Sequence, residues 1–74
     1  ATELMTVGVA DELTHALQIA QRSMELLLIE RTDISAEEAR ALAGAAVDFR
    51  LGQAGGYGVP VSVYAAFPRS AIAS

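Results

Sequence analysis

The side chains most able to do chemistry interrupt one apolar stretch, AAVDFRLGQAGGYG, which holds Asp48, Arg50 and Gln53. The helical spacing before this stretch predicts that the three emerge at the end of a helix, where a cation is favoured by the negative end of the helix dipole. An Asp/Arg pair can be held there between helix and sheet. We expect an ion pair with Gln53 bracing the next loop, and the alternative is that one of the three lines or supports a pocket.

Other candidate groups have simpler explanations. His15 follows Asp11 by four residues, which places both on one helical face, where they could bind a metal or act as a base. The chain holds no second His and no Cys, so we expect neither role. Glu37 and Glu38 are adjacent acids in a predicted first helical turn, where capping explains them. The loop GGYG follows a helix instead of preceding one, unlike a phosphate loop. We therefore expect no catalytic residue and no metal site in this chain alone.

Two segments alternate in the manner of β-strands. In residues 4–9, Met5, Val7 and Val9 share one side and Thr6 and Gly8 the other, as in a strand with one small or wet face. The second strand falls within YGVPVSVYAAF and stops at a proline. One of its faces holds Val59, Val61, Val63, Ala65 and Phe67, and the other holds Ser62, Tyr64 and Ala66.

Two helices are predicted between these strands. Asp11 is the expected N-cap of the first, which runs to about Glu30. Ser35 and Glu38 have the spacing of a capping box at the start of the second, and Gly52 would suit its C-cap. The apolar stripe of the first helix comprises Leu13, Ala16, Leu17, Ala20, Met24, Leu27 and Leu28. That of the second comprises Ala39, Leu42, Ala43, Ala46 and Phe49, with Gly44 allowing close approach to a neighbour.

The order β-α-α-β predicts a mixed fold of the α/β (α+β) class, with a helical hairpin packed on an antiparallel strand pair. We expect residues 1–74 to form one partial domain, with residues 69–74 as a loose tail. Two strands are too few for an independently stable sheet. Further strands are therefore expected from another chain or from the rest of a longer polypeptide.

Composition narrows the possible partners. Hydrophobic residues make up 53% of the chain and charged residues 19%, an apolar surplus that indicates an interface. The net charge of −4, with Arg but no Lys, disfavours nucleic acid. No apolar run approaches the length of a membrane span, and the first residues contain no basic leader segment. With no Cys, these features favour a soluble, cytoplasmic protein.

Three segments carry a family resemblance: TVGVADELTHAL, SAEEARALAGAAVDFRLGQ and VPVSVYAAFP. In order and spacing they resemble the C-terminal portion of the acetamidase/formamidase family, over about Leu4 to Pro68. Two departures are the extra Glu12 before Leu13 and the loop AGGYG, which replaces an apolar loop containing Asn or Pro. The residues that carry the resemblance are Asp11, Leu13, Ala16, Ser35, Glu38, Ala39, Asp48, Arg50, Gln53 and Pro68.

The resemblance implies an amidohydrolase that converts a short aliphatic amide, such as formamide or acetamide, to a carboxylate and ammonia. It also implies that a divalent metal such as zinc activates the water. The metal-binding motifs of the family belong to its larger N-terminal portion, so this chain would contribute scaffold and interface. The implied partners are that N-terminal portion or chain, the amide substrate and further copies in a homo-oligomer. The chain would be a C-terminal fragment, a small subunit of a split enzyme or a truncated relative.

Two other classes remain open. The first is a non-catalytic interaction module, in which Gly44 and its alanine neighbours pack against a partner. The second is a small-ligand regulatory module that dimerises through its sheet.

Overall fold

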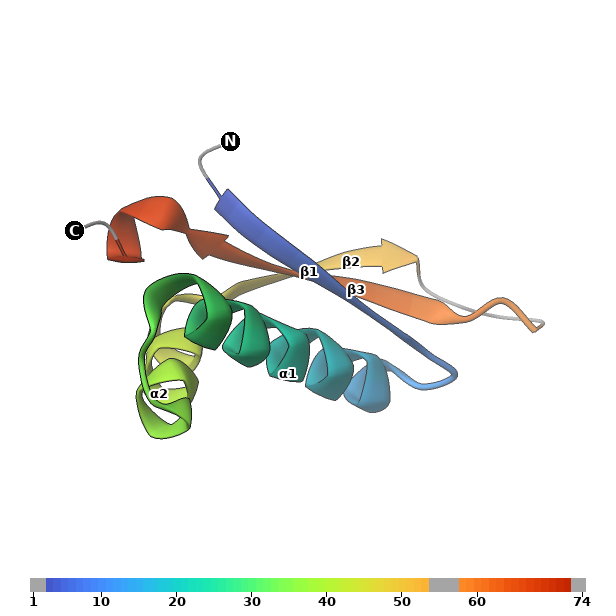
Figure 1. The fold of residues 1–74 in the computed structure, drawn as a ribbon. Helices are drawn as coiled ribbons and strands as arrows, with labels where there is room; N and C mark the ends of the chain where they lie inside the picture. Colours follow the sequence, from blue (N-terminus) through green and yellow to red (C-terminus); the bar gives the residue numbers. More distant parts are fainter. Residues whose placement is uncertain (1–2, 54–57, 73–74) are drawn as a thin grey trace.

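The computed structural model describes residues 3–53 and 58–72. The strands form one antiparallel sheet in the order β1-β3-β2, and both helices lie on the same face of it (Figure 1). The predicted α+β class, with a helical hairpin packed on antiparallel strands, is confirmed. The elements are β1 (Glu3–Ala10), α1 (Leu13–Thr32), α2 (Ala36–Ala46), β2 (Asp48–Gln53), β3 (Val61–Pro68) and the 3₁₀ helix η1 (Arg69–Ile72).

Strand β2 is the main departure from the sequence prediction. The second helix, expected to continue through Phe49, ends at Ala46, and Val47 is already extended with ψ of 141°. Apolar and charged side chains alternate along residues 47–51, which is the period of a strand. Phe49 also fits the apolar stripe of the preceding helix, but the strand pattern decides its structure. Gly52, expected as a helix C-cap, lies within β2. The chain therefore supplies one of the strands that was expected from elsewhere.

The starts of the two helices differ in how they are capped. The N-cap of α1 is Glu12 and not Asp11, and the Glu12 side chain makes no capping hydrogen bond. At α2 the predicted capping box is confirmed. The Ser35 hydroxyl accepts from the Glu38 amide at 3.0 Å, and the Glu38 carboxylate accepts from the Ser35 amide at 3.1 Å. The hydrogen bond from the Ser35 backbone, followed by that of its side chain, lowers the pKa of Glu38 below its ordinary value.

The small face of β1 is the face that packs against α1. A methyl group at Gly8 would meet the backbone carbonyl of Ala16 and the backbone nitrogen of Ala20. Beside it, the Thr6 hydroxyl donates to the Ala20 carbonyl oxygen at 2.8 Å. The close approach expected at Gly44 is not found among the described residues, because Gly44 faces open space. The close contact between helix and sheet therefore depends on Gly8.

The core lies between α1 and the central strand β3. Phe67, Met24, Leu28 and Val63 are the largest fully buried side chains. Residues 61, 63, 65 and 67 of β3 share one face as predicted, and this face is buried. Val59, placed on the same face by the sequence, precedes β3 and is 41% exposed. Of the predicted α1 stripe, every fourth residue from Ala16 to Leu28 is buried, whereas Leu13 is exposed.

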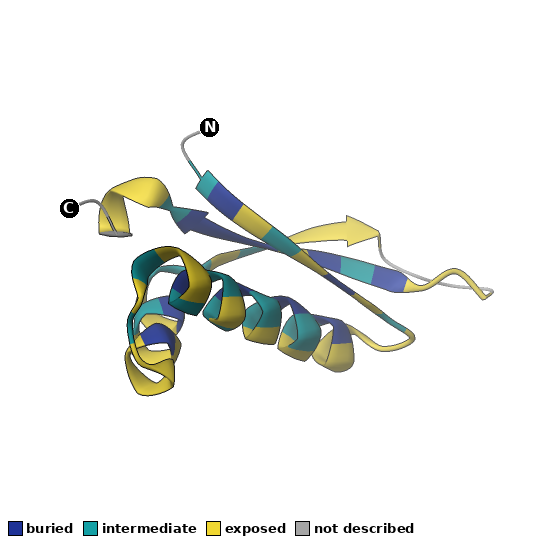
Figure 2. Ribbon diagram, viewed as in Figure 1, coloured by how far each residue is buried: buried dark blue, intermediate teal, exposed yellow. Residues whose placement is uncertain are grey.

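The opposite face of the sheet is open, and Figure 2 shows exposed residues along β1 and over most of β2. Met5, Val7 and Val9 of β1 and Tyr64 of β3 are between 39% and 50% exposed. The strand register places Val7 beside Tyr64 on this face. Among the described residues, no helix covers it. We call these four residues the open face.

Candidate functional site

Three charged side chains meet across the open face of the sheet. The Arg50 guanidinium donates to both carboxylate oxygens of Glu3, at 2.9 and 3.2 Å, and its Nε donates to an Asp48 carboxylate oxygen at 3.3 Å. Glu3 belongs to β1 and the other two to β2, so the cluster spans the central strand β3. Ala66 of β3 is paired with Asp48 and is fully buried although it lies on the open side. The cluster therefore covers one end of this face.

The electrostatics of this cluster are those of a solvated ion pair. Hydrogen bonding to Glu3, and then to Asp48, raises the pKa of Arg50 above its ordinary value. The Arg50 side chain is about half exposed, so water and salt screen the attraction. The three groups satisfy one another, and the cluster joins the two outer strands to each other.

The predicted pair between Asp48 and Arg50 is therefore confirmed, but its predicted location is wrong. Both residues lie within β2 and not at a helix exit, because α2 ends before them. Gln53 lies at the far end of β2, opposite Ser62 and beyond a register shift. The side-chain hydrogen bonds of Arg50 within the described residues go to Glu3 and Asp48 and not to Gln53.

Sequence reasoning missed the contribution of Glu3 to this cluster. Glu3 is 47 residues from Arg50 in the chain, and no local pattern relates them. Their contact depends on the strand order, which places β3 between β1 and β2. Predicting this contact would have required the strand order and the register. The register places Glu3 beside Pro68 and Asp48 beside Ala66 on the central strand.

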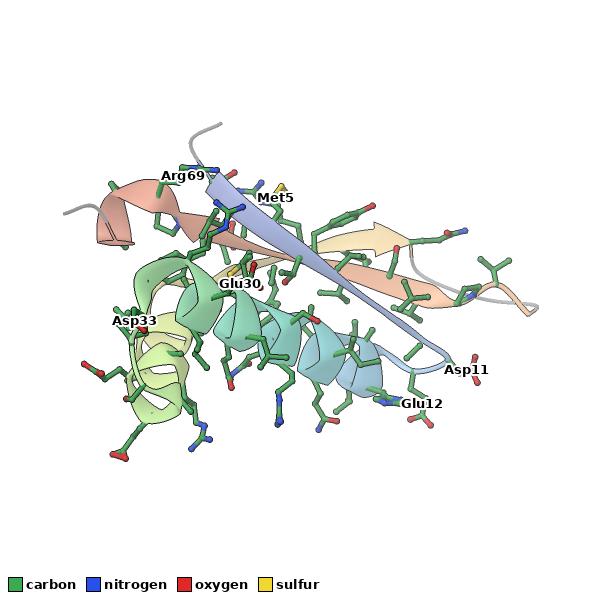
Figure 3. All side chains as sticks on the ribbon, in the orientation of Figure 1. Met5, Asp11, Glu12, Glu30, Asp33 and Arg69 are labelled. Carbon is green, nitrogen blue, oxygen red and sulfur yellow. The ribbon has the colours of Figure 1, made fainter. Side chains whose placement is uncertain are left out.

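The remaining candidates lie away from this cluster. Asp11 and Glu12 are at the turn between β1 and α1 and point outward, whereas Met5 lies toward the other end of β1 (Figure 3). His15 is exposed on the first turn of α1. Within residues 3–53 and 58–72, no three His, Asp or Glu side chains gather where they could hold a metal ion. Most of the loop GGYG lies outside the described residues.

A small apolar groove lies between the start of α1 and β2. It has a volume of about 220 Å³. It exists because α1 covers β1 and β3 and leaves β2 largely uncovered. Leu13, part of the predicted apolar stripe of α1, lines this groove. The other lining residues are Leu17, Phe49, Arg50, Leu51 and Val63.

Comparison with known proteins gave no match: no family model, curated protein or solved structure is significantly similar to this chain. In the described part of the chain, neither helix has the length and apolar character needed to cross a membrane.

Proposed function

We propose that this chain is the C-terminal segment or a small subunit of an acetamidase/formamidase-like amidohydrolase that hydrolyses a short aliphatic amide to a carboxylate and ammonia. In this proposal the chain contributes scaffold and interface. The observation that carries it is the open face. The other side of the sheet exposes four apolar or aromatic side chains, Met5, Val7, Val9 and Tyr64, and a contiguous apolar surface of this kind is typical of an interaction site. The larger amidase portion would cover this surface.

The residues of the family resemblance support a scaffold role. Ala16 and Ala39 are fully buried between the helices and the sheet. Ser35 and Glu38 cap α2, while Asp48 and Arg50 help to join the outer strands. Each of these residues has a structural task, and none of them forms a nucleophile and base pair.

The divalent metal of the proposed enzyme would be held by the N-terminal portion. The described residues of this chain offer no set of three ligands, so we derive no catalytic step through them. The proposal places the assembled enzyme in the cytoplasm as a homo-oligomer. It also predicts that this chain alone has no amidase activity.

The proposal is tested by joining this chain to an amidase N-terminal portion and measuring assembly by native mass spectrometry and ammonia release from formamide and acetamide. Tyr64→Glu places a charge on the open face and should abolish assembly and activity together. Leu13→Glu is the matched control, because Leu13 is exposed on the helical side. Assembly that tolerates Tyr64→Glu, or the absence of any assembly and activity, would refute the proposal.

The apolar groove favours a second candidate, a small-ligand regulatory module. Its volume of about 220 Å³ is below the roughly 300–1,000 Å³ of typical ligand pockets, which is why we rank it second. Native mass spectrometry of the purified chain would test it. A small bound ligand that is lost in Leu17→Arg would favour this candidate over the amidase segment.

A further inference from the structure

The outer edge of β1 is a long strand edge without protection. Strand β1 has eight residues and pairs with β3 on one side only among the described residues. It contains no Pro and no Lys, its pairing with β3 has no register shift, and its single charge is Glu3 at its first position. Native sheets usually block such an edge with Lys, Pro, a bulge or a short strand, because free amides and carbonyls pair with another strand.

The other edge of the same sheet shows this protection. Strand β2 has six residues, a register shift between Leu51 and Gln53, and charged side chains at Asp48 and Arg50. A bulge and nearby charges discourage a further strand. The two edges of the sheet therefore differ, and only the β1 edge remains suited to strand pairing.

The flank of α1 above the β1 edge carries two apolar side chains, Ile19 and Leu26, between Glu12 and Glu30. Leu13 and Leu17 line the groove on the β2 side of α1. Ile19 is offset from Leu17 by about 160° around a helix with 3.6 residues per turn, so it lies on the opposite flank, toward β1. Leu26 follows Ile19 by seven residues, which places it on nearly the same line. Leu26 is 55% exposed, and Ile19 is half-buried.

We propose that a second copy of this chain pairs with β1 through its outer edge, antiparallel and about a two-fold axis at Val7, to form a six-stranded sheet. The inference goes beyond the proposed function, because it concerns the edge of the sheet and not the open face. Such an axis stands perpendicular to the sheet, so both helical layers lie on the same side. The flanks of the two α1 helices, each with Ile19 and Leu26, then face each other.

The side chains of β1 match this arrangement. Centring the axis on Val7 places Val7 opposite Val7, and Met5 opposite Val9, on the open side. On the helical side it places Thr6 opposite Gly8, so no like charges face each other within the strands. Centring on Thr6 would instead place Glu3 opposite Val9 inside the paired strands. The Val7 register pairs only uncharged residues, from Leu4 to Ala10, and leaves Glu3 opposite Asp11, which lies beyond the end of β1. We therefore take the Val7 register as the better one.

The area of this surface is sufficient for a specific dimer. Eight strand residues extend for about 27 Å, and a sheet with one helical layer is about 20 Å deep, which gives on the order of 500 Å² per copy. The total of about 1,000 Å² reaches the lower bound for a biological interface. A heterologous strand would bury the edge of β1 but would not match Ile19 and Leu26 with equivalent residues.

Disulfide trapping tests this proposal, because the natural chain contains no Cys. Opposed residues of antiparallel strands have Cα atoms about 4.5–5.5 Å apart, within the range for a disulfide. Val7→Cys should give a covalent dimer under mild oxidation, whether in this chain or in a longer polypeptide that contains it. Leu51→Cys, on the exposed β2 edge, is the matched control and should stay uncrosslinked.

Sedimentation equilibrium supplies a second measurement that needs no disulfide. Val7→Lys places two like charges at the axis and should weaken dimerisation by at least about tenfold. Leu51→Lys should leave it within about twofold of the natural chain, and circular dichroism checks that both variants remain folded. A monomeric natural chain, equal trapping by both Cys variants, or a dimer that tolerates Val7→Lys would overturn the proposal. Val7 also belongs to the open face, so Tyr64→Glu separates the two proposals: it changes the open face but not the β1 edge and should leave the dimer intact. Loss of the dimer in Tyr64→Glu would assign the association to the open face and overturn the strand-edge proposal.

Discussion

Arg50 connects the two outer strands of the sheet through Glu3, while the central strand passes between them. Asp48 contributes the longer of these contacts, at 3.3 Å, and is the most exposed of the three side chains. The three charged side chains therefore link the outer strands and do not form a reactive centre. The contribution of these ion pairs to stability depends on whether another layer covers the open face, because burial removes the screening by water.

Replacement of Asp48 separates a structural role from an active-site role. In the isolated chain, Asp48→Asn should change the melting temperature little, because Arg50 keeps both contacts with Glu3 and the site is exposed. Glu3→Gln should have the larger effect, and that effect should shrink at high salt. In an assembled amidase, Asp48→Asn should lower the melting temperature or assembly before it lowers turnover per assembled molecule. Turnover reduced by several orders of magnitude at an unchanged melting temperature would contradict this and place Asp48 at the substrate.

Gly8 of β1, which contacts α1, and Gly44 of α2 allow a matched pair of substitutions. Gly8→Ala would drive a methyl group into the backbone of α1 at Ala16 and Ala20, so we expect a loss of about 1–3 kcal/mol in the free energy of unfolding. Gly44→Ala adds a methyl group into open space within α2 and should increase stability by up to about 1 kcal/mol. Urea denaturation followed by circular dichroism measures both changes. Equal effects of the two variants would show that Gly8 does not set the distance between helix and sheet.

At the scale of elements, the sequence predicted best where a local rule acts alone. The spacing of Ser35 and Glu38 identified the start of α2, and the alternation of residues 61–67 identified the faces of β3. It failed at Phe49, which fits both a helical stripe and a strand. That conflict is resolved by pairing with β3, and this pairing is not encoded locally. Similarly, only the contact of Gly8 with α1 shows that the small face of β1 is the buried one.

The capping box of α2 makes a pH dependence predictable. The pKa of Glu38 is lower in the folded chain than its ordinary value of 4.5, so its contribution to stability is fully present above that value. The contribution is lost as the pH falls through the lowered pKa. In an acid titration, the helical circular dichroism signal should therefore decrease partly as the pH falls through the lowered pKa of Glu38.

Substitutions separate this contribution from general acid unfolding. Glu38→Gln keeps a hydrogen-bond acceptor for the Ser35 amide but does not titrate in this range. It should remove the acid-dependent part while α2 still forms. Ser35→Ala should cost about 1 kcal/mol at neutral pH. An unchanged acid titration in Glu38→Gln would assign the pH dependence to other carboxylates.

At the scale of the molecule, the described strands and the helices α1 and α2 enclose a core on one side of the sheet only. The fully buried residues lie between the helices and the helical face of the sheet, apart from Ala66 beneath the Arg50 cluster. Apolar side chains remain exposed on the open face, along the flank of α1 and in the groove beside β2. A small chain that leaves this much apolar surface exposed retains little net stability unless association covers part of it.

Association should therefore appear in the thermal unfolding of the isolated chain. Because a dimer is stabilised by mass action, its midpoint should rise as the protein concentration is raised from micromolar to hundreds of micromolar. Val7→Lys should lower the midpoint and flatten this dependence, whereas Leu51→Lys should preserve it. Calorimetry at several concentrations, with sedimentation at each, makes the comparison. A dilute, monodisperse monomer that unfolds cooperatively at a concentration-independent midpoint would show that one covered face of this sheet is sufficient for folding.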